Sequence, residues 1–146
     1  MKKIWYSHSP QETEEIGRRL AKHLHAGDVL AFFGGLGMGK TAFVRGLADG
    51  LSVSEPVSSP TFALVHEHKG TLPLYHFDMY RVNSWDDLES TGFFDCLCQS
   101  AIVAVEWSEN IENALPEHAI SITIAPGERE EERVITLEGA DEACEF

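Results

Sequence analysis

Gly34-Gly35-Leu36-Gly37-Met38-Gly39-Lys40-Thr41 is a glycine-rich segment between an apolar run and a predicted helix. It matches the phosphate-binding loop pattern G-x-x-x-x-G-K-[ST] at every fixed position. The apolar run 29–33 before it predicts a buried strand, and the apolar residues after it recur at helical spacing over 43–51. Strand, glycine-rich loop and helix in this order point backbone N–H groups and the positive end of a helix at a polyphosphate. In this pattern Lys40 would reach the β- and γ-phosphates, and the Thr41 hydroxyl would bind Mg²⁺.

The hydrophobic pattern of the remaining chain predicts an α/β fold of the P-loop NTPase type. Ser9-Pro10-Gln11-Glu12 is a capping box that predicts the start of a helix. Further strands are expected over 3–7, 62–68, 72–81, 101–105, 120–124 and 134–137, and helices over 10–26, 40–49 and 84–92. We therefore expect a central mixed, largely parallel sheet flanked by helices, with an antiparallel hairpin and C-terminal antiparallel strands. Residues 1–138 would form a single domain, and residues 139–146 an acidic, flexible tail.

Composition and charge narrow the possible partners and the location of the chain. The 146 residues carry a formal net charge of −13, and no run of Lys or Arg offsets it. Such a surface repels phosphates, so we expect no binding of DNA, and none of RNA by this chain alone. Three cysteines, an odd number, argue against a disulfide framework and favour a reducing cytoplasm. No segment approaches the length of a membrane span, so we expect a cytoplasmic protein without membrane attachment.

Two acidic residues, Asp78 and Glu106, each come at the end of an extended run, 72–77 and 101–105 respectively. The carboxyl ends of strands in open α/β sheets face the ligand crevice. Phosphoryl chemistry on a phosphate loop needs one carboxylate to hold Mg²⁺ and a second group to orient the nucleophile. Either acid could hold the metal ion, and the sequence alone leaves open which one does.

Two further groups of polar residues have both a functional and a plain structural interpretation. Ser59-Pro60-Thr61 lies in the connection after the loop helix, where its hydroxyls could form a nucleotide switch or a simple proline turn. His66 and His68 share one face of their strand, and His76 lies across the predicted hairpin. Because a fourth ligand is missing from this pattern, we interpret the histidines as surface polarity rather than as a metal site.

The same blocks of residues resemble the TsaE family, small bacterial phosphate-loop ATPases that act in making threonylcarbamoyladenosine (t6A) on tRNA. The matching blocks lie within residues 9–107, in the order and spacing of the family. They are 34–41 with 43–47, Ser59-Pro60-Thr61-Phe62, His76-Phe77-Asp78-Met79-Tyr80-Arg81, and Glu106-Trp107. Gly35 and Met38 depart from the family, which often has aspartate and alanine there, and the region after residue 126 matches poorly.

The resemblance implies the cofactors, partners and site residues of the protein. ATP and Mg²⁺ would be bound, with ADP as product, and hydrolysis would drive a complex of TsaB and TsaD that itself holds the tRNA. The implied metal ligands are Thr41 and Glu106, and the implied catalytic residues are Lys40, Asp78, Glu106 and Thr61. The implied nucleotide contacts come from Ser9, Gly37, Met38, Gly39, Lys40, Thr41 and Ala42.

Other functions remain open on the sequence alone. A small-molecule or nucleoside kinase would use the same loop but clamps its substrates with arginines on a lid. The arginines of this chain are scattered, at Arg18, Arg19, Arg45, Arg81, Arg129 and Arg133. A GTPase switch would need N-K-x-D and D-x-x-G motifs, and neither occurs. A relic loop in a protein without catalytic activity is the third alternative.

Overall fold

The computed structural model describes residues 2–34, 39–54 and 65–139. Gly37, Met38 and Thr61, and with them the switch hypothesis, lie outside the described residues. The strands are β1 (Lys2–Ser7), β2 (Val29–Phe33), β3 (Val65–His68), β4 (Leu74–Asp78), β5 (Ile102–Glu106), β6 (Ile120–Pro126) and β7 (Arg133–Glu138). The helices are α1 (Pro10–Ala21), α2 (Lys40–Gly50), α3 (Trp85–Ser90), α4 (Phe93–Leu97) and the 3₁₀ segment η1 (Ser108–Ala114).

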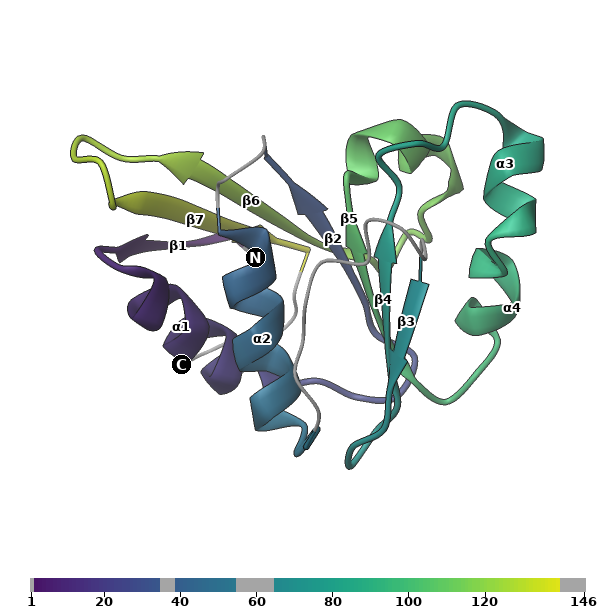
Figure 1. Ribbon diagram of the computed structural model, residues 1–146, viewed down its shortest axis with the longest axis horizontal. Helices are drawn as coiled ribbons and strands as arrows, with labels where there is room; N and C mark the ends of the chain where they lie inside the picture. The colour runs from purple at the N-terminus through teal and green to yellow at the C-terminus, as the bar shows by residue number, and fades with distance from the viewer. Residues whose placement is uncertain (1, 35–38, 55–64, 140–146) are drawn as a thin grey trace.

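The described strands form one mixed sheet in the order β1-β7-β6-β2-β5-β4-β3 (Figure 1). Its centre is parallel, because β6, β2, β5 and β4 run in the same direction. Its edges are antiparallel, through the β3–β4 hairpin on one side and β6–β7–β1 on the other. The expected mixed α/β sheet with a hairpin and C-terminal antiparallel strands is therefore confirmed. Within the described residues, no helix has the length and hydrophobicity needed to cross a membrane.

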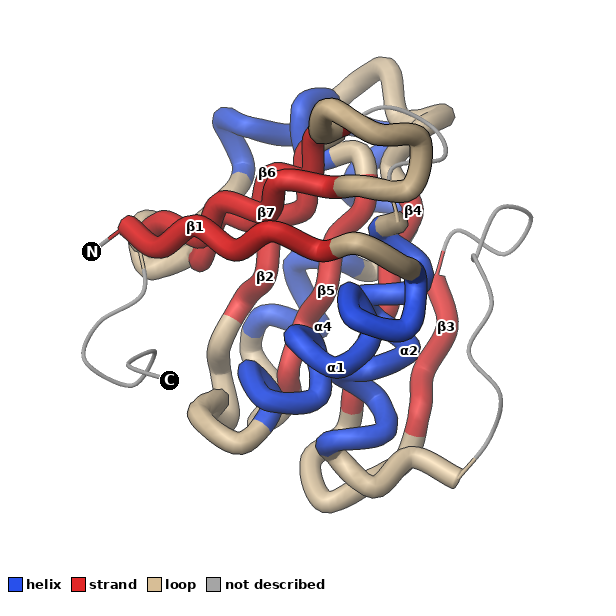
Figure 2. The backbone as a smooth tube through the Cα atoms, turned by 90° about the vertical axis from the view of Figure 1, so that its left-hand side faces the viewer, coloured by secondary structure: helices blue, strands red, loops and turns tan. Residues whose placement is uncertain are grey.

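Both faces of the parallel centre are covered by helices (Figures 1 and 2). On one face, α1 and α2 pack with Phe32 and Ile102 in one hydrophobic cluster. On the other face, α3, α4 and η1 pack with Phe77 and Val103 in a second cluster. Alternate residues of a strand point to opposite faces, so a strand covered on both sides must be apolar throughout. All five residues of β5 are buried, as the continuous apolar run predicts.

Glycines allow α1 and α2 to pack with their backbones almost in contact. A Cβ atom at Gly46 would lie 1.8 Å from the carbonyl oxygen of Glu14, and one at Gly17 would lie 2.3 Å from that of Phe43. No side chain fits into such gaps. The two helices therefore form one closely packed unit, and its position sets the direction in which the start of α2 points.

The structure corrects two predicted boundaries, of which the first is the end of α1. The helix ends at Ala21, and not near residues 26–27. After Ala21 the N–H groups of His23 and Leu24 bond carbonyls three residues back, which tightens the chain into a turn. Leu24 is buried as the helical spacing suggested. It reaches the core from this turn, so hydrophobic spacing alone misplaced the helix end.

The second corrected boundary is that of β4, which covers Leu74–Asp78 and not the whole of 72–81. Beyond it, the Asp78 side chain accepts a 2.9 Å hydrogen bond from the Tyr80 N–H, and Val82 N–H bonds the Met79 carbonyl. These bonds bend the chain away from the sheet directly after Asp78. The bend places the acidic side chain at the end of the strand.

Candidate active site at the start of α2

Lys40 is the first residue of α2, and its side chain is buried. The preceding Gly39 has φ of 93°, a left-handed conformation that favours glycine. The Lys40 ammonium donates a 2.8 Å hydrogen bond to the carbonyl of Gly34, at the other end of the glycine-rich stretch. The first turn of α2 continues with Thr41, half-buried, and Ala42, buried. The lysine thus lies where the N–H groups of the first helical turn point outward.

An aromatic ring covers one side of this lysine. The Lys40 Nζ atom lies 4.2 Å from the ring centroid of Trp107, within the range of a cation–π interaction. Trp107 directly follows β5 and has φ of 59°, which is uncommon for a residue other than glycine. Its ring in turn packs against Tyr80, with centroids 4.9 Å apart. The unusual backbone of Trp107 thus turns the indole toward the lysine rather than along the strand.

The two strand-end acids lie side by side at the carboxyl edge of the sheet. Asp78 and Glu106 are paired residues in the register of β4 and β5, and both are buried. The Met79 N–H donates to the Glu106 carbonyl at 3.0 Å, which continues the ladder to this edge. The expectation that the two acids share one edge is confirmed. Which of them holds a metal ion stays a prediction.

The buried ammonium of Lys40 lies near the buried carboxylates of Asp78 and Glu106. Burial lowers the pKa of the Lys40 ammonium below its ordinary value, while the carboxylates of Glu106, Glu109 and Asp78 act in the opposite direction. Burial is the larger of these influences. The lysine is therefore incompletely compensated by the protein, and an anion near it would favour its charged form.

Sequence reasoning missed Glu109, which lies in η1. Its Oε2 atom accepts a 3.2 Å hydrogen bond from the N–H of Gly34, so it anchors the start of the glycine-rich stretch. No local pattern distinguishes Glu109 from the other acids of η1. Its partner is 75 residues away in the sequence, and only the fold brings them together.

Sequence reasoning also misjudged His68 and His76, which are both buried and not part of a polar surface, and of the two His76 is the one beside the strand-end acids. Its Nε2 atom lies 2.5 Å from Oε2 of Glu106. It pairs with His66 across the β3–β4 hairpin, as expected. The sequence did indicate that His76 lies on the same face of the strand as Asp78, because the two residues are two positions apart.

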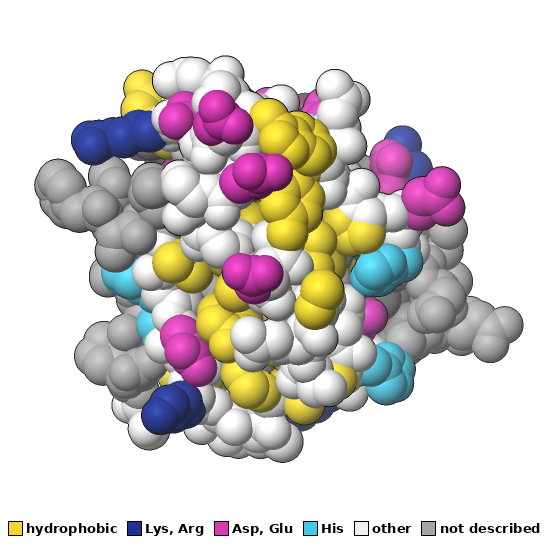
Figure 3. Space-filling view, turned by 90° about the vertical axis from the view of Figure 1, so that its right-hand side faces the viewer, with side chains coloured by type: hydrophobic (Ala, Val, Ile, Leu, Met, Phe, Trp, Pro, Cys, Tyr) yellow, Lys and Arg dark blue, Asp and Glu magenta, His cyan; other side chains and the backbone are white. Residues whose placement is uncertain are grey.

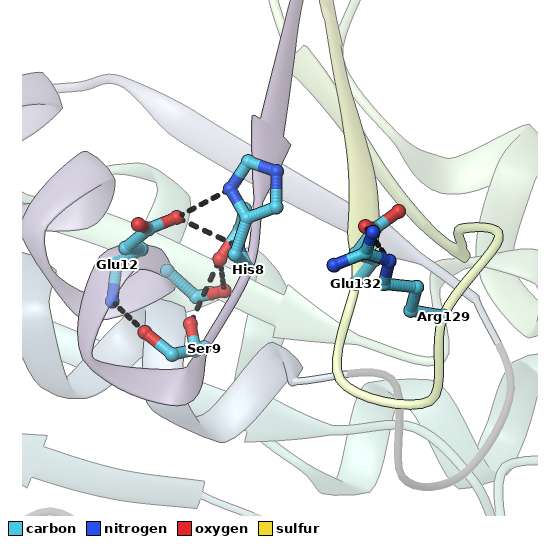
Figure 4. Close-up of polar contacts among 7 residues, drawn as sticks. His8, Ser9, Glu12, Arg129 and Glu132 are labelled. Carbon is cyan, nitrogen blue, oxygen red and sulfur yellow. Dashed lines mark hydrogen bonds and ion pairs between the residues drawn. The ribbon is translucent and has the colours of Figure 1, made fainter.

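Ser9, the N-cap residue of α1, lines the same cavity as Gly39 at the start of α2. Its Oγ atom accepts a 3.1 Å hydrogen bond from the Glu12 N–H, and the Glu12 carboxylate accepts one of 2.6 Å from the His8 N–H (Figure 4). The expected capping box is thus present, with His8 rather than Ser9 as the reciprocal donor. A cavity of about 250 Å³ opens here, lined by Ser9, Pro10, Thr13, Gly39, Glu130, Glu131 and Arg133.

A second cavity, of about 300 Å³, lies between the start of α3 and η1. Glu109 and Asn110 belong to its lining, together with the half-exposed Trp85. Asn110 donates a 2.7 Å hydrogen bond to the Met79 carbonyl, just after Asp78. The face of the molecule on this side carries a broken band of hydrophobic side chains with acidic side chains beside it (Figure 3). This cavity is therefore close to the end of β4, where Asp78 lies.

Comparison with known proteins connects this arrangement to one family. A family model described as "Threonylcarbamoyl adenosine biosynthesis protein TsaE" matches residues 7–135, which include every element from α1 to β6. The chain belongs to the TsaE family. The match extends beyond residue 126, where resemblance by motifs was weak, so the C-terminal strands are part of the family fold.

Individual relatives agree with this assignment. The TsaE protein of Treponema pallidum is 39% identical over 127 residues, covering 85% of this chain and 94% of the relative. The Bacillus subtilis TsaE protein is 39% identical over 137 residues, covering 92% and 85%. The crystal structure of Bacillus subtilis YdiB superposes with a TM-score of 0.79 at 34% identity, covering 94% of this chain and 84% of that one. The TsaE fold described here is thus shared nearly end to end.

Proposed function

We propose that this chain binds ATP with Mg²⁺ at the start of α2 and hydrolyses it to drive the cycle of a t6A-forming complex. One observation carries the proposal: a buried lysine in the first turn of α2 lies among acids at the ends of two adjacent parallel strands. A phosphate loop with a lysine, next to strand-end acids, is the arrangement by which P-loop NTPases bind and cleave nucleotides. Because this chain has the same arrangement, we assign it to the P-loop NTPase fold.

The start of α2 would bind the phosphates of the nucleotide. The backbone N–H groups of Gly39, Thr41 and Ala42, with those of 37 and 38, would point at the anion together with the positive end of the helix. The Lys40 ammonium would exchange its bond to Gly34 for the β- and γ-phosphates. Ser9, which lines the same cavity as Gly39, would lie on the side of the base.

The oxygen donors of the site suit a hard cation such as Mg²⁺. Among the described residues no group of three or more His, Cys, Asp or Glu could hold a metal ion by themselves. Mg²⁺ is commonly bound by one or two carboxylates together with substrate phosphates, so fewer protein ligands suffice. Thr41 and Glu106 are the proposed ligands. When bound, the ion would neutralise charge that develops on the phosphates.

Asp78 is the proposed residue for orienting the attacking water, with Thr61 in the switch. One oxygen of Asp78 is already held by the Tyr80 N–H, which leaves the other oxygen available in a defined direction. A fixed acceptor next to the reacting phosphate would align the water for in-line attack. Asp78 would therefore matter for hydrolysis more than for binding.

A complex of TsaB and TsaD is the proposed partner, and turnover by the chain alone should be slow. Phosphoryl transfer is accelerated strongly by an arginine that stabilises the transition state. Arg18 and Arg45 instead make ion pairs with Asp49 and Glu14 on the surface of α1 and α2. A partner could complete the site, and its motion could be coupled to hydrolysis. A nucleoside kinase remains the alternative, and it would phosphorylate an acceptor without partners.

ATP turnover with and without the TsaB–TsaD complex tests the proposal. We expect little phosphate release from the chain alone and a clear stimulation by the complex. Release that is unaffected by the complex but increases with added nucleosides would indicate the kinase instead.

Lys40→Ala tests the position of the site in the same assays. We expect ATP binding to weaken by about 10- to 100-fold, because hydrogen bonds to charged groups contribute about 1.5–3 kcal/mol. The exposed Lys22→Ala, at the end of α1, is the matched control and should bind as the wild type does. Calorimetry with ADP and Mg²⁺ measures both, and wild-type affinity in Lys40→Ala would exclude the assigned site.

A further inference from the structure

We propose that His76 is a positioning residue, which orients the Glu106 carboxylate toward the metal ion. The inference rests on the proposed function, because it takes Glu106 as a metal ligand. Its basis is the 2.5 Å contact between the imidazole Nε2 and the carboxylate Oε2 of two buried side chains.

The sheet register explains how the two side chains meet. His76 is paired with Ala104 of β5, while Glu106 is paired with Asp78. The small side chain of Ala104 leaves room above it, so the imidazole can lean diagonally along the sheet to Glu106. Diagonal neighbours on one face of a sheet lie within reach of long and aromatic side chains.

The contact also determines the proton on the ring. An ionised carboxylate has only acceptor sites, so the hydrogen bond requires the proton on Nε2. The buried Nδ1 atom has no hydrogen-bond partner among the described residues. A second N–H at that position would be a buried donor without an acceptor, which is costly. The geometry therefore places a proton on Nε2, from which it is donated to the Glu106 carboxylate.

The consequence for Glu106 is a fixed orientation. Glutamate has several side-chain torsions, and ordering them costs about 1.5–2 kcal/mol in the absence of a partner. The bond to Oε2 holds the carboxylate and leaves Oε1 available for a cation. Asp78 needs no such help, because the bend directly after β4 supplies the Tyr80 N–H. Ligands held by a hydrogen-bonded neighbour bind metals more tightly, and loss of that neighbour typically costs 10–100-fold in affinity.

Two substitutions of similar polarity separate positioning from packing. The amide nitrogen of His76→Gln reaches the place of Nε2 and can still donate to Glu106, whereas that of His76→Asn is too short. We expect His76→Asn to weaken Mn²⁺ binding to the ADP-bound protein about tenfold, and His76→Gln to restore most of it. Electron paramagnetic resonance of free Mn²⁺ measures the metal directly. ADP affinity in the presence of EDTA should be unchanged in both variants.

Wild-type Mn²⁺ affinity in a folded His76→Asn variant would overturn the positioning role. Glu106→Gln distinguishes this from failure of the proposed function, because unchanged Mn²⁺ affinity in that variant would mean that Glu106 is not a ligand at all. If the His76 variants do not fold, long-range ¹H–¹⁵N spectra of the wild type decide the matter. A proton on Nε2 of His76 supports the proposal, and a proton on Nδ1 alone contradicts it.

Discussion

At the scale of single residues, the site combines a lysine that the protein compensates incompletely with acids that are each held by a hydrogen bond. Burial lowers the pKa of Lys40 more than the neighbouring acids raise it. Asp78 is held by the Tyr80 N–H, and Glu106 by the His76 ring. Preorganised groups of this kind need little rearrangement when a ligand binds. This preorganisation agrees with the proposed binding of an anion together with a cation at the start of α2.

Separate substitutions of Glu106 and Asp78 can show which of the two binds the metal ion and which is needed for hydrolysis. We expect Glu106→Gln to weaken the Mg²⁺-dependent part of ADP binding by about tenfold or more, because a neutral amide is a poorer ligand for a hard cation. Asp78→Asn should bind ADP and Mg²⁺ normally but lose partner-stimulated phosphate release. Calorimetry with and without Mg²⁺ and phosphate-release assays measure the two effects. The reverse pattern would make Asp78 the metal ligand.

At the scale of elements, α1 and α2 act as one unit because glycines let their backbones touch. The ion pair of Arg18 with Asp49, 2.5 Å long, adds a link between the same helices at their exposed side. Surface ion pairs of this kind contribute little, typically about 0–1 kcal/mol. Close backbone packing therefore holds α1 and α2 together more strongly than the ion pair between Arg18 and Asp49 does.

Gly46→Ala should destabilise the protein although alanine is the better helix former. In an isolated helix the change would gain about 0.5–1 kcal/mol. Here the new Cβ would lie 1.8 Å from the Glu14 carbonyl oxygen, so α1 must shift, and overpacking of this kind costs about 1–3 kcal/mol or more. Urea unfolding measures the difference. Arg45→Ala, at the exposed neighbouring position, should change stability by less than about 0.5 kcal/mol, and a stabilised Gly46→Ala would refute the packing described here.

The N-cap of α1 predicts an acid-dependent contribution to stability. The hydrogen bond from the His8 N–H, together with the His8 side chain, lowers the pKa of Glu12 below its ordinary value of 4.5. A carboxylate with a lowered pKa stabilises the folded state above its unfolded-state pKa, and this contribution is lost as the pH falls through the lowered value. Glu12→Gln should therefore reduce the melting temperature at neutral pH and have a smaller effect in acid.

Melting curves measured across this pH range test the contribution of Glu12. Glu117→Gln, which removes an exposed carboxylate on a loop, is the matched control. A loss of stability that is equal at neutral and acid pH would show that the Glu12 charge plays no part.

At the scale of the whole molecule, a chain with a strongly negative net charge carries a locally positive potential at the start of α2. The chain has 24 acidic and 11 basic residues. The Lys40 ammonium and the N–H groups at the start of α2 give a local positive potential against this background. Mononucleotides can use such a small site, whereas a long nucleic acid would also meet the surrounding negative charge.

The isolated chain should therefore not bind tRNA, even though its family is named for a tRNA modification. Fluorescence anisotropy with labelled tRNA should show no association, and lowering the salt concentration should not produce it, because no phosphate-binding surface releases counterions. The proposed TsaB–TsaD complex, measured under the same conditions, is the comparison. Salt-sensitive tRNA binding by the chain alone would contradict the role assigned to its charge.

Much of the site could be predicted because its signals are local. The glycine-rich stretch, the apolar strand before it and the acids after two strands are all short patterns, and the structure places Lys40, Asp78 and Glu106 as those patterns suggest. The role of His76 could not be predicted, because its partner depends on the register between two strands. The end of α1 was misplaced because Leu24 keeps the helical spacing although the chain has already turned.

The backbone conformation of short segments follows from local sequence, since glycines, caps and apolar periodicity act over a few residues. The strand order, the contact of Glu109 with Gly34 and the bond between His76 and Glu106 arise only when the chain has folded. These depend on residues distant in the chain being brought together by the burial of both faces of one sheet. The hydrophobic effect is non-directional, so it favours the packed arrangement as a whole. No local sequence pattern therefore indicates which distant residues will be in contact.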